Sequence, residues 1–269
     1  MKLNSKNISQ QKRIENEFLK EGYTINKIEN TQDLKWIKDH YLKIICDVIK
    51  FKNKHELNKY DFFNNIHKFV KKTNLNDFRL KVINRINSSK KFKSLYYKIC
   101  KPYLDILVGE ELVMQNRINL SIQLPKDKGS LLHTHADTWD GNSPFEIVVW
   151  LPLVDCYKTK SMYILPYSQY KSFEKYYKKR KEKKLDIFNK FKKRFKWLKI
   201  DYGQILLFNQ SLPHGNIMNK EKETRWSMNC RFKNPFTPYS EKKIGEFFSP
   251  IKLKPLSELG LKYKLPDEI

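Results

Sequence analysis

Residues 131–137 read Leu-Leu-His-Thr-His-Ala-Asp and lie within a β-rich part of the chain. From Asn116 onward the apolar residues change from helical spacing to alternation, and Pro, Gly, Asp and Asn separate the runs. The sequence predicts strands near 117–124, 131–136, 145–152, 161–165, 204–208, 213–217 and 224–232. Short strands at this spacing predict an antiparallel jelly roll, also called a double-stranded β-helix.

The chain before residue 111 is predicted to be helical. Apolar residues recur there with helical spacing, and the expected helices cover 34–48, 62–70, 78–86 and the run that ends before Pro102. Thr31 and Asp61 are the expected N-caps of the first two helices. We expect residues 1–269 to form a single α+β domain, in which a helical buttress (1–110) supports a cupin-like jelly-roll core (111–269).

A basic segment, residues 171–199, interrupts the predicted strands. It is dense in Lys and Arg, with aromatic residues between the charges. We expect one or two surface helices, inserted at 169–200 between strands of the core. Two interpretations of this insert stay open: a basic lid or anion-binding face, and a solvated helix that packs its aromatic side chains on the barrel.

The composition suits a globular enzyme, with 40% hydrophobic residues in a chain of 269. No run approaches the roughly 18 apolar residues that span a bilayer, and the first residues lack the apolar core of a signal peptide. The four cysteines are scattered singly, which suggests neither a disulfide framework nor a CxxC metal site, so we expect a cytoplasmic protein. The net charge of +25 suits an anionic partner, but heavy use of Lys, Asn and Ile through biased codon composition explains it equally well.

Two histidines and one aspartate have the spacing of a metal site. His135 and Asp137 are two residues apart, so on an extended strand they point to the same side. His214, from a distant predicted strand, completes a set of two imidazoles and one carboxylate. That set leaves coordination positions open and is typical of non-haem Fe(II) oxygenases rather than of closed structural zinc sites. The sequence therefore predicts these three residues as the metal ligands and the catalytic centre.

An arginine and a serine that follow His214 predict an anion-binding pair. Residues 214–226 have the pattern of a strand, a polar turn and a returning strand, which predicts a hairpin with Arg225 across from His214. Arg225 and Ser227 are two apart and face the same side. A guanidinium plus a hydroxyl suits the distal carboxylate of 2-oxoglutarate, because a buried carboxylate needs a paired cation. Arg231 on the same strand is the second candidate, and a surface ion pair of Arg225 is the alternative interpretation.

Together these residues resemble a known family. The HxD pair at 135–137, the Leu-Leu-Phe strand at 206–208, and Arg225-x-Ser227 eleven residues beyond His214 look like the 2-oxoglutarate/Fe(II) dioxygenases, nearest the phytanoyl-CoA hydroxylase-like branch. Residues 161–168 look equivalent to a strand and turn between the ligands in that branch, with Tyr167 in place of glycine.

More narrowly, residues 133–145 and 150–156 resemble the carbohydrate-cluster oxygenases related to streptomycin biosynthesis. The resemblance covers roughly residues 110–235 and implies Fe(II), 2-oxoglutarate as cosubstrate, and O2. It also implies hydroxylation or oxidation of a sugar-derived small molecule in surface polysaccharide or aminoglycoside-like biosynthesis. The basic surface is compatible with an anionic substrate, and we expect no specific nucleic acid and no membrane span. The oligomeric state stays open.

Alternation on one predicted strand suggests further cofactor-binding residues. Asn119, Ser121 and Gln123 share one side of that strand, so Asn119 and Gln123 are predicted to help bind the metal-bound oxo acid. A polar row that faces solvent is the alternative.

The residues around the HxD pair suggest a substrate contact. Trp139 and Asp140 directly follow the ligand Asp137 and are predicted to stack on and hydrogen-bond a sugar, although Asp-Gly-Asn-Ser is also ordinary turn chemistry. His133 is predicted to orient Asp137 or the substrate, and as a core histidine it would be equally ordinary.

Two other functions stay open. A cupin-like enzyme would bind metal through His133, His135 and His214 without 2-oxoglutarate, which leaves Arg225 without a role. A non-enzymatic anion binder would use the jelly roll as a scaffold, but the sequence has no zinc-finger, RNP-like or helix-turn-helix motif. A halogenase of the same fold usually lacks the carboxylate ligand, so Asp137 argues against that branch.

Overall fold

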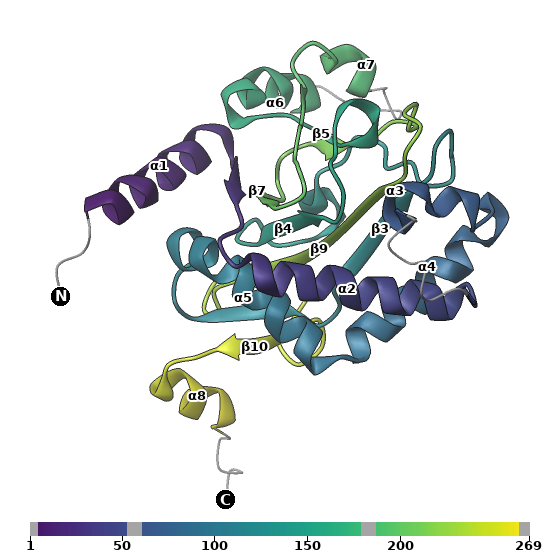
Figure 1. The fold of residues 1–269 in the computed structure, drawn as a ribbon. Helices are drawn as coiled ribbons and strands as arrows, with labels where there is room; N and C mark the ends of the chain where they lie inside the picture. Colours follow the sequence, from purple (N-terminus) through teal and green to yellow (C-terminus); the bar gives the residue numbers. More distant parts are fainter. Residues whose placement is uncertain (1–4, 53–60, 179–186, 264–269) are drawn as a thin grey trace, which may run out of the picture.

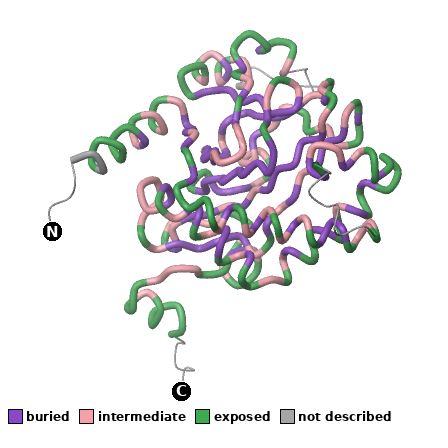
Figure 2. The backbone as a smooth tube through the Cα atoms, in the orientation of Figure 1, coloured by how far each residue is buried: buried purple, intermediate pink, exposed green. Residues whose placement is uncertain are grey.

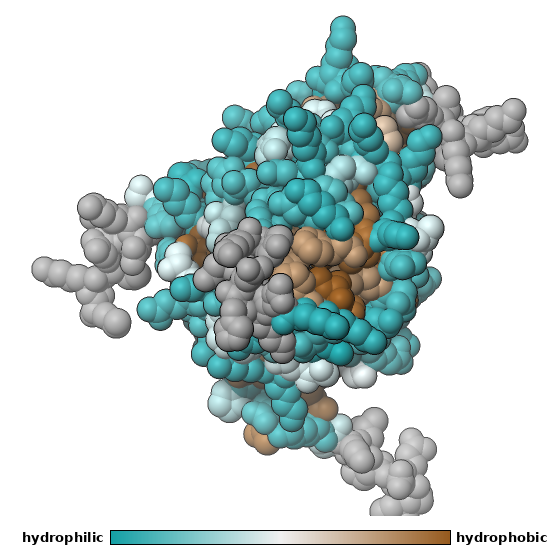
Figure 3. Space-filling view, turned by 45° about the vertical axis from the view of Figure 1, so that its right-hand side comes forward, coloured by the Kyte–Doolittle hydropathy of each residue, from teal (hydrophilic) through white to brown (hydrophobic). Residues whose placement is uncertain are grey.

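The computed structural model describes residues 5–52, 61–178 and 187–263 (Figure 1). Within these ranges the α-helices are α1 (Ser5–Glu21), α2 (Thr31–Val48), α3 (Phe62–Asn65), α4 (Leu75–Ser88), α5 (Lys90–Leu107), α6 (Tyr170–Lys178), α7 (Ile187–Phe191) and α8 (Pro255–Lys262). None of these helices is long and apolar enough to cross a bilayer. Figure 3 shows a surface that is mostly hydrophilic, with a broad apolar area to the right of the centre and a few smaller ones.

The strands form two antiparallel sheets. They are β1 (Tyr23–Lys27), β2 (Leu112–Gln115), β3 (Asn119–Gln123), β4 (Ile147–Pro152), β5 (Tyr163–Ile164), β6 (Lys196–Trp197), β7 (Gln204–Asn209), β8 (His214–Gly215), β9 (Arg225–Lys233) and β10 (Phe248–Lys252). The larger sheet has the order β1-β7-β4-β9-β2-β10, with β3 also paired to β9, and the smaller sheet has the order β6-β5-β8. Helices together with antiparallel sheets agree with the predicted α+β class.

Successive side chains of strand β9 point to opposite faces of the larger sheet, one apolar and one polar. On the apolar face the ring of Trp226 meets that of Tyr41 edge-on at 6.4 Å, and the Tyr41 hydroxyl donates to the sulfur of Met228 at 3.7 Å. Arg225 and Arg231, which alternate with these residues, line a cavity on the other face. Helices α2 to α5 therefore cover the apolar face of the larger sheet. Figure 2 shows that the buried residues are concentrated in the strands.

The N-cap of α2 is Asn30 and not the predicted Thr31. The Asn30 side-chain oxygen accepts a hydrogen bond from the backbone N–H of Asp33 at 3.0 Å. Both residues are common capping types, so the sequence pattern leaves the boundary uncertain by one residue. Asp61 caps α3 as predicted and accepts from the backbone N–H of Asn64 at 3.2 Å.

Helix α5 continues through Pro102 to Leu107, although the sequence predicted an end before the proline. A proline inside a helix removes one backbone hydrogen bond. Tyr103 and Leu104, which follow it, are buried. Their packing continues the apolar stripe of the helix and offsets the lost bond.

The N-terminal part contains a strand that the sequence did not predict. Strand β1 pairs with β7 from Tyr23 opposite Phe208 to Lys27 opposite Gln204. Its five residues mix polar and apolar types, and its partner is far away in the sequence, so the local pattern carries little signal. Strands β2, β6 and β10 are likewise absent from the predicted set.

The predicted hairpin between the strands of His214 and Arg225 is wrong. Strand β8 pairs with β5 in the smaller sheet, whereas β9 belongs to the larger one. The Asn219 side chain holds the connection by donating to the carbonyl oxygens of Gln123 at 3.3 Å and Glu223 at 2.8 Å. The chain between the two strands therefore crosses from one sheet to the other instead of folding back.

The described part of the basic segment forms α6, α7 and β6. Helices α6 and α7 lie close to β5 (Figure 1), and β6 is an edge strand of the smaller sheet itself. The rings of Phe188 and Phe195 lie 4.6 and 4.8 Å from the ring of Tyr163 in β5. This is the packing expected if the segment places its aromatic side chains on the core. Residues 179–186 of the predicted insert lie outside the described residues.

Candidate metal centre

Backbone hydrogen bonds bring the two predicted ligand segments together. The N–H of His135 donates to the carbonyl of His214 at 3.0 Å, and the N–H of His214 donates back at 2.8 Å. The N–H of Asp137, at the start of a 3-10 turn, donates to the carbonyl of Gln210 at 3.0 Å. The strand predicted at 131–136 is thus reduced to a single bridge, which nevertheless joins both segments at the donor residues.

The three predicted donor side chains converge. One ligand atom from each of His135, Asp137 and His214 lies within 4.8 Å of the others. Nε2 of His135 is 3.7 Å from Oδ1 of Asp137, and the two imidazole centroids are 4.4 Å apart. In the described ranges no other group of three His, Cys, Asp or Glu side chains has this geometry.

Both imidazoles are oriented by their own backbone. Nδ1 of His135 lies 2.8 Å from the carbonyl oxygen of His133, and Nδ1 of His214 lies 2.8 Å from that of Leu212. A carbonyl oxygen only accepts, so each Nδ1 carries the proton and each Nε2 keeps its lone pair. This arrangement is what a metal-ligating histidine needs.

Burial and charge set the protonation of the donors. Burial lowers the pKa of His214 to about 4, so its ring is neutral near pH 7. Burial alone would raise the pKa of Asp137, but its interactions with the adjacent His214 ring and with the charged, hydrogen-bonding guanidinium of Arg231 hold the pKa below its usual value. A neutral imidazole and an ionised carboxylate are the ligand forms of these groups. Two imidazoles and one carboxylate fit a divalent transition metal with open positions.

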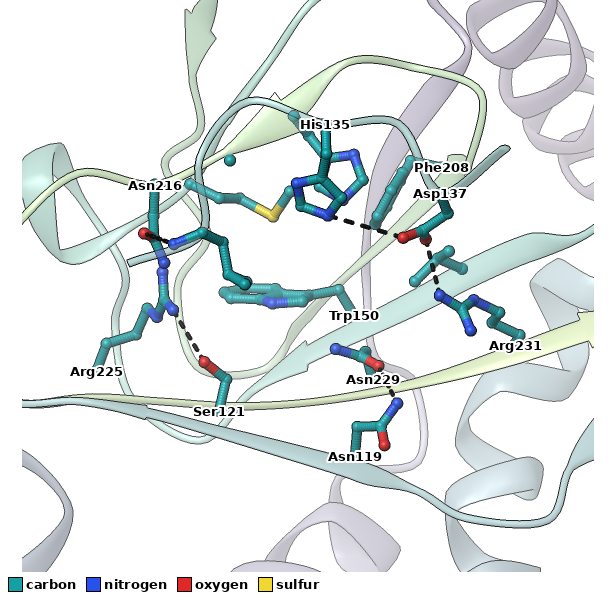
Figure 4. Close-up of a pocket in the computed structure, with 15 residues that line it drawn as sticks. Asn119, Ser121, His135, Asp137, Trp150, Phe208, Asn216, Arg225, Asn229 and Arg231 are labelled. Atoms are coloured by element: carbon teal, nitrogen blue, oxygen red, sulfur yellow. Dashed lines mark hydrogen bonds and ion pairs between the residues drawn. The ribbon is translucent and has the colours of Figure 1, made fainter. Parts of the chain in front are cut away.

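A cavity of about 180 Å³ adjoins the three donors and is lined by residues of both sheets (Figure 4). Arg225 reaches it from β9, and in Figure 4 the indole of Trp150 lies beneath His135, with Arg225 on its left. The guanidinium is buried and donates to the carbonyl of Ser161 at 3.2 Å and to Oγ of Ser121 at 3.0 Å.

The charge of Arg225 is not neutralised by a carboxylate of the described residues, and its Nε has no hydrogen-bond partner. Burial lowers the pKa of Arg225, yet a guanidinium stays protonated in proteins. A buried cation without a counter-ion is costly. Because Arg225 lies on the wall of a cavity, an anion that entered the cavity could pair with it.

The other predicted cofactor-binding residues lie on the same polar face, not all of them on the cavity wall. Asn119 lines the cavity and donates to Oδ1 of Asn229 at 3.1 Å. Gln123 is buried, is not among the residues that line the cavity, and donates to the carbonyl of Ile217 at 2.6 Å. Ser227 is buried opposite Ser121, and its hydroxyl has no hydrogen-bond partner. The hydroxyl that contacts Arg225 is that of Ser121, not that of Ser227.

The predicted substrate-binding residues lie outside the cavity wall. The indole of Trp139 stacks on Tyr177 at 4.7 Å and on Phe173 at 5.9 Å, both in α6. Asp140 is exposed, and so is His133, whose backbone rather than its ring contacts His135. The loop after Asp137 turns toward the basic insert, so the indole packs there and is not presented to the cavity. The side chain of Asp137 forms an ion pair with Arg231.

Arg231 was predicted as the second candidate to bind the carboxylate of the oxo acid. In the structure it contacts a metal-ligand candidate instead. It forms an ion pair with Asp137 at 3.1 Å. Strand alternation already indicates that Arg225, Asn229 and Arg231 share a face, and all three line the cavity. Only the fold shows that the two arginines lie at opposite ends of it (Figure 4).

Comparisons with known proteins establish a shared fold. No family model matches this sequence, and no curated protein is similar to it in sequence. The structure of SnoK, described as a non-heme alpha ketoglutarate dependent carbocyclase from nogalamycin biosynthesis, superposes with a TM-score of 0.54 at 12% identity, over 90% of this chain and 96% of that one. The non-heme monooxygenase ThoJ gives 0.53 at 14% identity, over 90% and 84%.

A third structure, AviO1 from Streptomyces viridochromogenes Tue57, gives a TM-score of 0.52 at 11% identity, over 86% of this chain and 97% of that one. Most of this chain therefore has the fold of these structures, two of which are described as non-heme enzymes.

Proposed function

We propose that this protein is a non-haem Fe(II)- and 2-oxoglutarate-dependent oxygenase with a jelly-roll core. One observation carries the proposal: a cavity brings together a two-histidine, one-carboxylate cluster and a buried arginine that lacks a counter-ion. The first suits an open Fe(II) site and the second suits the distal carboxylate of 2-oxoglutarate. The fold shared with non-heme enzymes supports the same conclusion.

The side chains would divide the work as follows. His135, Asp137 and His214 would hold the metal through Nε2, a carboxylate oxygen and Nε2. Arg225 would pair with the distal carboxylate while Ser121 and the carbonyl of Ser161 keep the guanidinium in place. When bound, Fe(II) and 2-oxoglutarate would activate O2, which is the oxidant: 2-oxoglutarate would supply two electrons and be converted to succinate and CO2 with one oxygen atom, and the other oxygen atom would oxidise the substrate. The protein orients the ligands and keeps the reaction away from water.

A sugar-derived small molecule is the proposed substrate, in carbohydrate biosynthesis. The resemblance of residues 133–145 and 150–156 to carbohydrate-cluster oxygenases supports this class, within the phytanoyl-CoA hydroxylase-like branch. The amides of Asn119, Asn216 and Asn229 on the cavity wall support it too, because amides donate to and accept from hydroxyl groups. The three-histidine alternative has less support, since His133 is exposed and outside the donor cluster.

Anaerobic titration tests the cofactors separately from the substrate. Adding 2-oxoglutarate to the protein with Fe(II) should produce a visible charge-transfer band in the wild type, and His135→Ala should lose both metal and band. Succinate formation should then be measured with a panel of nucleotide-sugars and aminocyclitols. A band without turnover on any of them would refute the sugar assignment alone, whereas no metal binding would refute the oxygenase.

A further inference from the structure

We infer that Arg231 is a positioning residue that reserves one oxygen of Asp137 for the metal, and that Glu146 holds Arg231 in place. The inference rests on the proposed metal centre and adds the device that orients its carboxylate. Arg231 lies in β9 of the larger sheet, and Asp137 begins the 3-10 turn at 137–140. Their contact therefore also connects this turn to the larger sheet.

The two oxygens of Asp137 face different partners (Figure 4). Oδ2 lies 3.1 Å from Nη2 of Arg231, while Oδ1 lies 3.7 Å from Nε2 of His135, on the side of the donor cluster. The side chains of Asp137 and Arg231 are only 14% and 16% exposed, so water screens their attraction weakly. With Oδ2 occupied, the carboxylate cannot rotate freely and offers the metal a single oxygen.

A second carboxylate lies behind the arginine. Nε of Arg231 is 3.9 Å from Oε2 of Glu146, whose side chain is 1% exposed. Oε1 of Glu146 accepts from the backbone N–H of Ser143 at 3.4 Å, and Oε2 has no hydrogen-bond partner. The guanidinium therefore lies between two carboxylates, one at the metal centre and one buried in the protein. Glu146 is not one of the three donors, so we expect its effect on the metal to pass through Arg231.

The direction in which metal affinity changes when Arg231 is removed distinguishes a positioning role from a purely electrostatic one. A fixed positive charge beside the centre repels a divalent cation, so if Arg231 acted only through its charge, its removal would tighten metal binding. If it positions Asp137, removal weakens binding, since the loss of a residue that orients a ligand typically costs 10- to 100-fold in metal affinity. Lys242 provides a matched control. Its charge interacts with Asp137, Arg231 and Glu146, but its ammonium donates to Asn142 and not to Asp137.

The test uses Co(II) alone, with affinity from titration and coordination from the visible ligand-field spectrum. Arg231→Gln should weaken Co(II) binding about 10- to 100-fold and alter the spectrum. Arg231→Lys should recover part of the affinity, because an ammonium can reach Oδ2 without reproducing the planar fork. Glu146→Gln should weaken binding less and in the same direction. Lys242→Gln should stay within about threefold of the wild type or bind slightly more tightly.

Equal or tighter Co(II) binding by Arg231→Gln, with a wild-type spectrum, would overturn the inference and leave the metal centre intact. If that variant does not fold, Arg231→Lys and Glu146→Gln decide: wild-type affinity and spectra in both would overturn it as well. Failure of the wild type to bind Co(II) would instead refute the metal centre on which the inference depends.

Discussion

Replacing Arg225 with Met should greatly weaken 2-oxoglutarate binding without unfolding the protein. Arg225 is 3% exposed, and its guanidinium is not paired with any described carboxylate. Truncating one partner of a buried, hydrogen-bonded charge pair costs about 2–5 kcal/mol of binding energy. Since about 1.4 kcal/mol corresponds to a factor of ten, the affinity for 2-oxoglutarate should fall roughly 30-fold to several thousand-fold.

The stability of the ligand-free variant should respond differently. Met removes the cost of an unpaired buried charge, which is up to several kcal/mol. Against this, Oγ of Ser121 and the carbonyl of Ser161 each lose a hydrogen bond worth about 1 kcal/mol. These opposing contributions are similar in size, so the free energy of unfolding should be unchanged within about 2 kcal/mol or should rise.

Thermal unfolding with Fe(II) under anaerobic conditions measures both effects. At about 100 times its Kd, 2-oxoglutarate should stabilise the wild type by about 2.7 kcal/mol. For a chain of this size that corresponds to a rise in Tm of roughly 5–10 °C. Arg225→Met should show at most about a third of that rise at the same concentration, because its Kd for 2-oxoglutarate should be at least about 30-fold higher. Arg225→Lys, which keeps the charge but loses the two-pronged donor, should show a smaller rise than the wild type.

The opposite pattern would refute the reasoning. If Arg225→Met lost more than about 3 kcal/mol of unfolding free energy and still gained the full Tm rise from 2-oxoglutarate, Arg225 would be a structural residue. The anion site would then have to lie elsewhere.

Other variants test the remaining assignments. Because burial lowers the pKa of His214 to about 4, the unfolded chain takes up a proton between pH 6.5 and 4 that the folded chain does not. The metal-free protein should therefore lose stability as the pH falls through that range, by up to about 3 kcal/mol. His214→Asn should flatten this slope in urea titrations, and identical slopes would contradict the assignment. Trp139→Ala should cost about 1–3 kcal/mol of stability, because its indole stacks on two rings of α6. If Trp139→Ala instead left the Tm unchanged and raised the KM for the substrate, Trp139 would contact the substrate. Asp140→Asn should change neither stability nor turnover measurably, since the side chain is exposed, and a large loss of turnover would show that it reaches the substrate.

Several elements followed directly from local patterns. The apolar stripe of α2, the Asp61 cap and the strands around 119–123, 147–152, 204–209 and 225–233 lie close to their predicted places. Each depends on forces between residues near in sequence: helical or twofold periodicity, and side-chain bonds to the adjacent backbone. The same periodicity identified the shared faces of β3 and β9, and the spacing of His135 and Asp137 identified two donors that do converge with His214.

The alternation of polar and apolar residues along a strand does not predict which sheet the strand joins. A turn-like run after His214 predicted a hairpin, but β8 and β9 joined different sheets, because strand pairing depends on partners far away in the chain. The placement of Trp139 against α6, the pairing of Arg231 with Asp137, and the isolation of the Arg225 charge depend on that same long-range arrangement. Residue types and periodicity thus identified the donors and the faces on which they lie. Distances, burial and counter-ions arise only when remote segments pack, because electrostatic and packing energies depend on separation in space rather than along the chain.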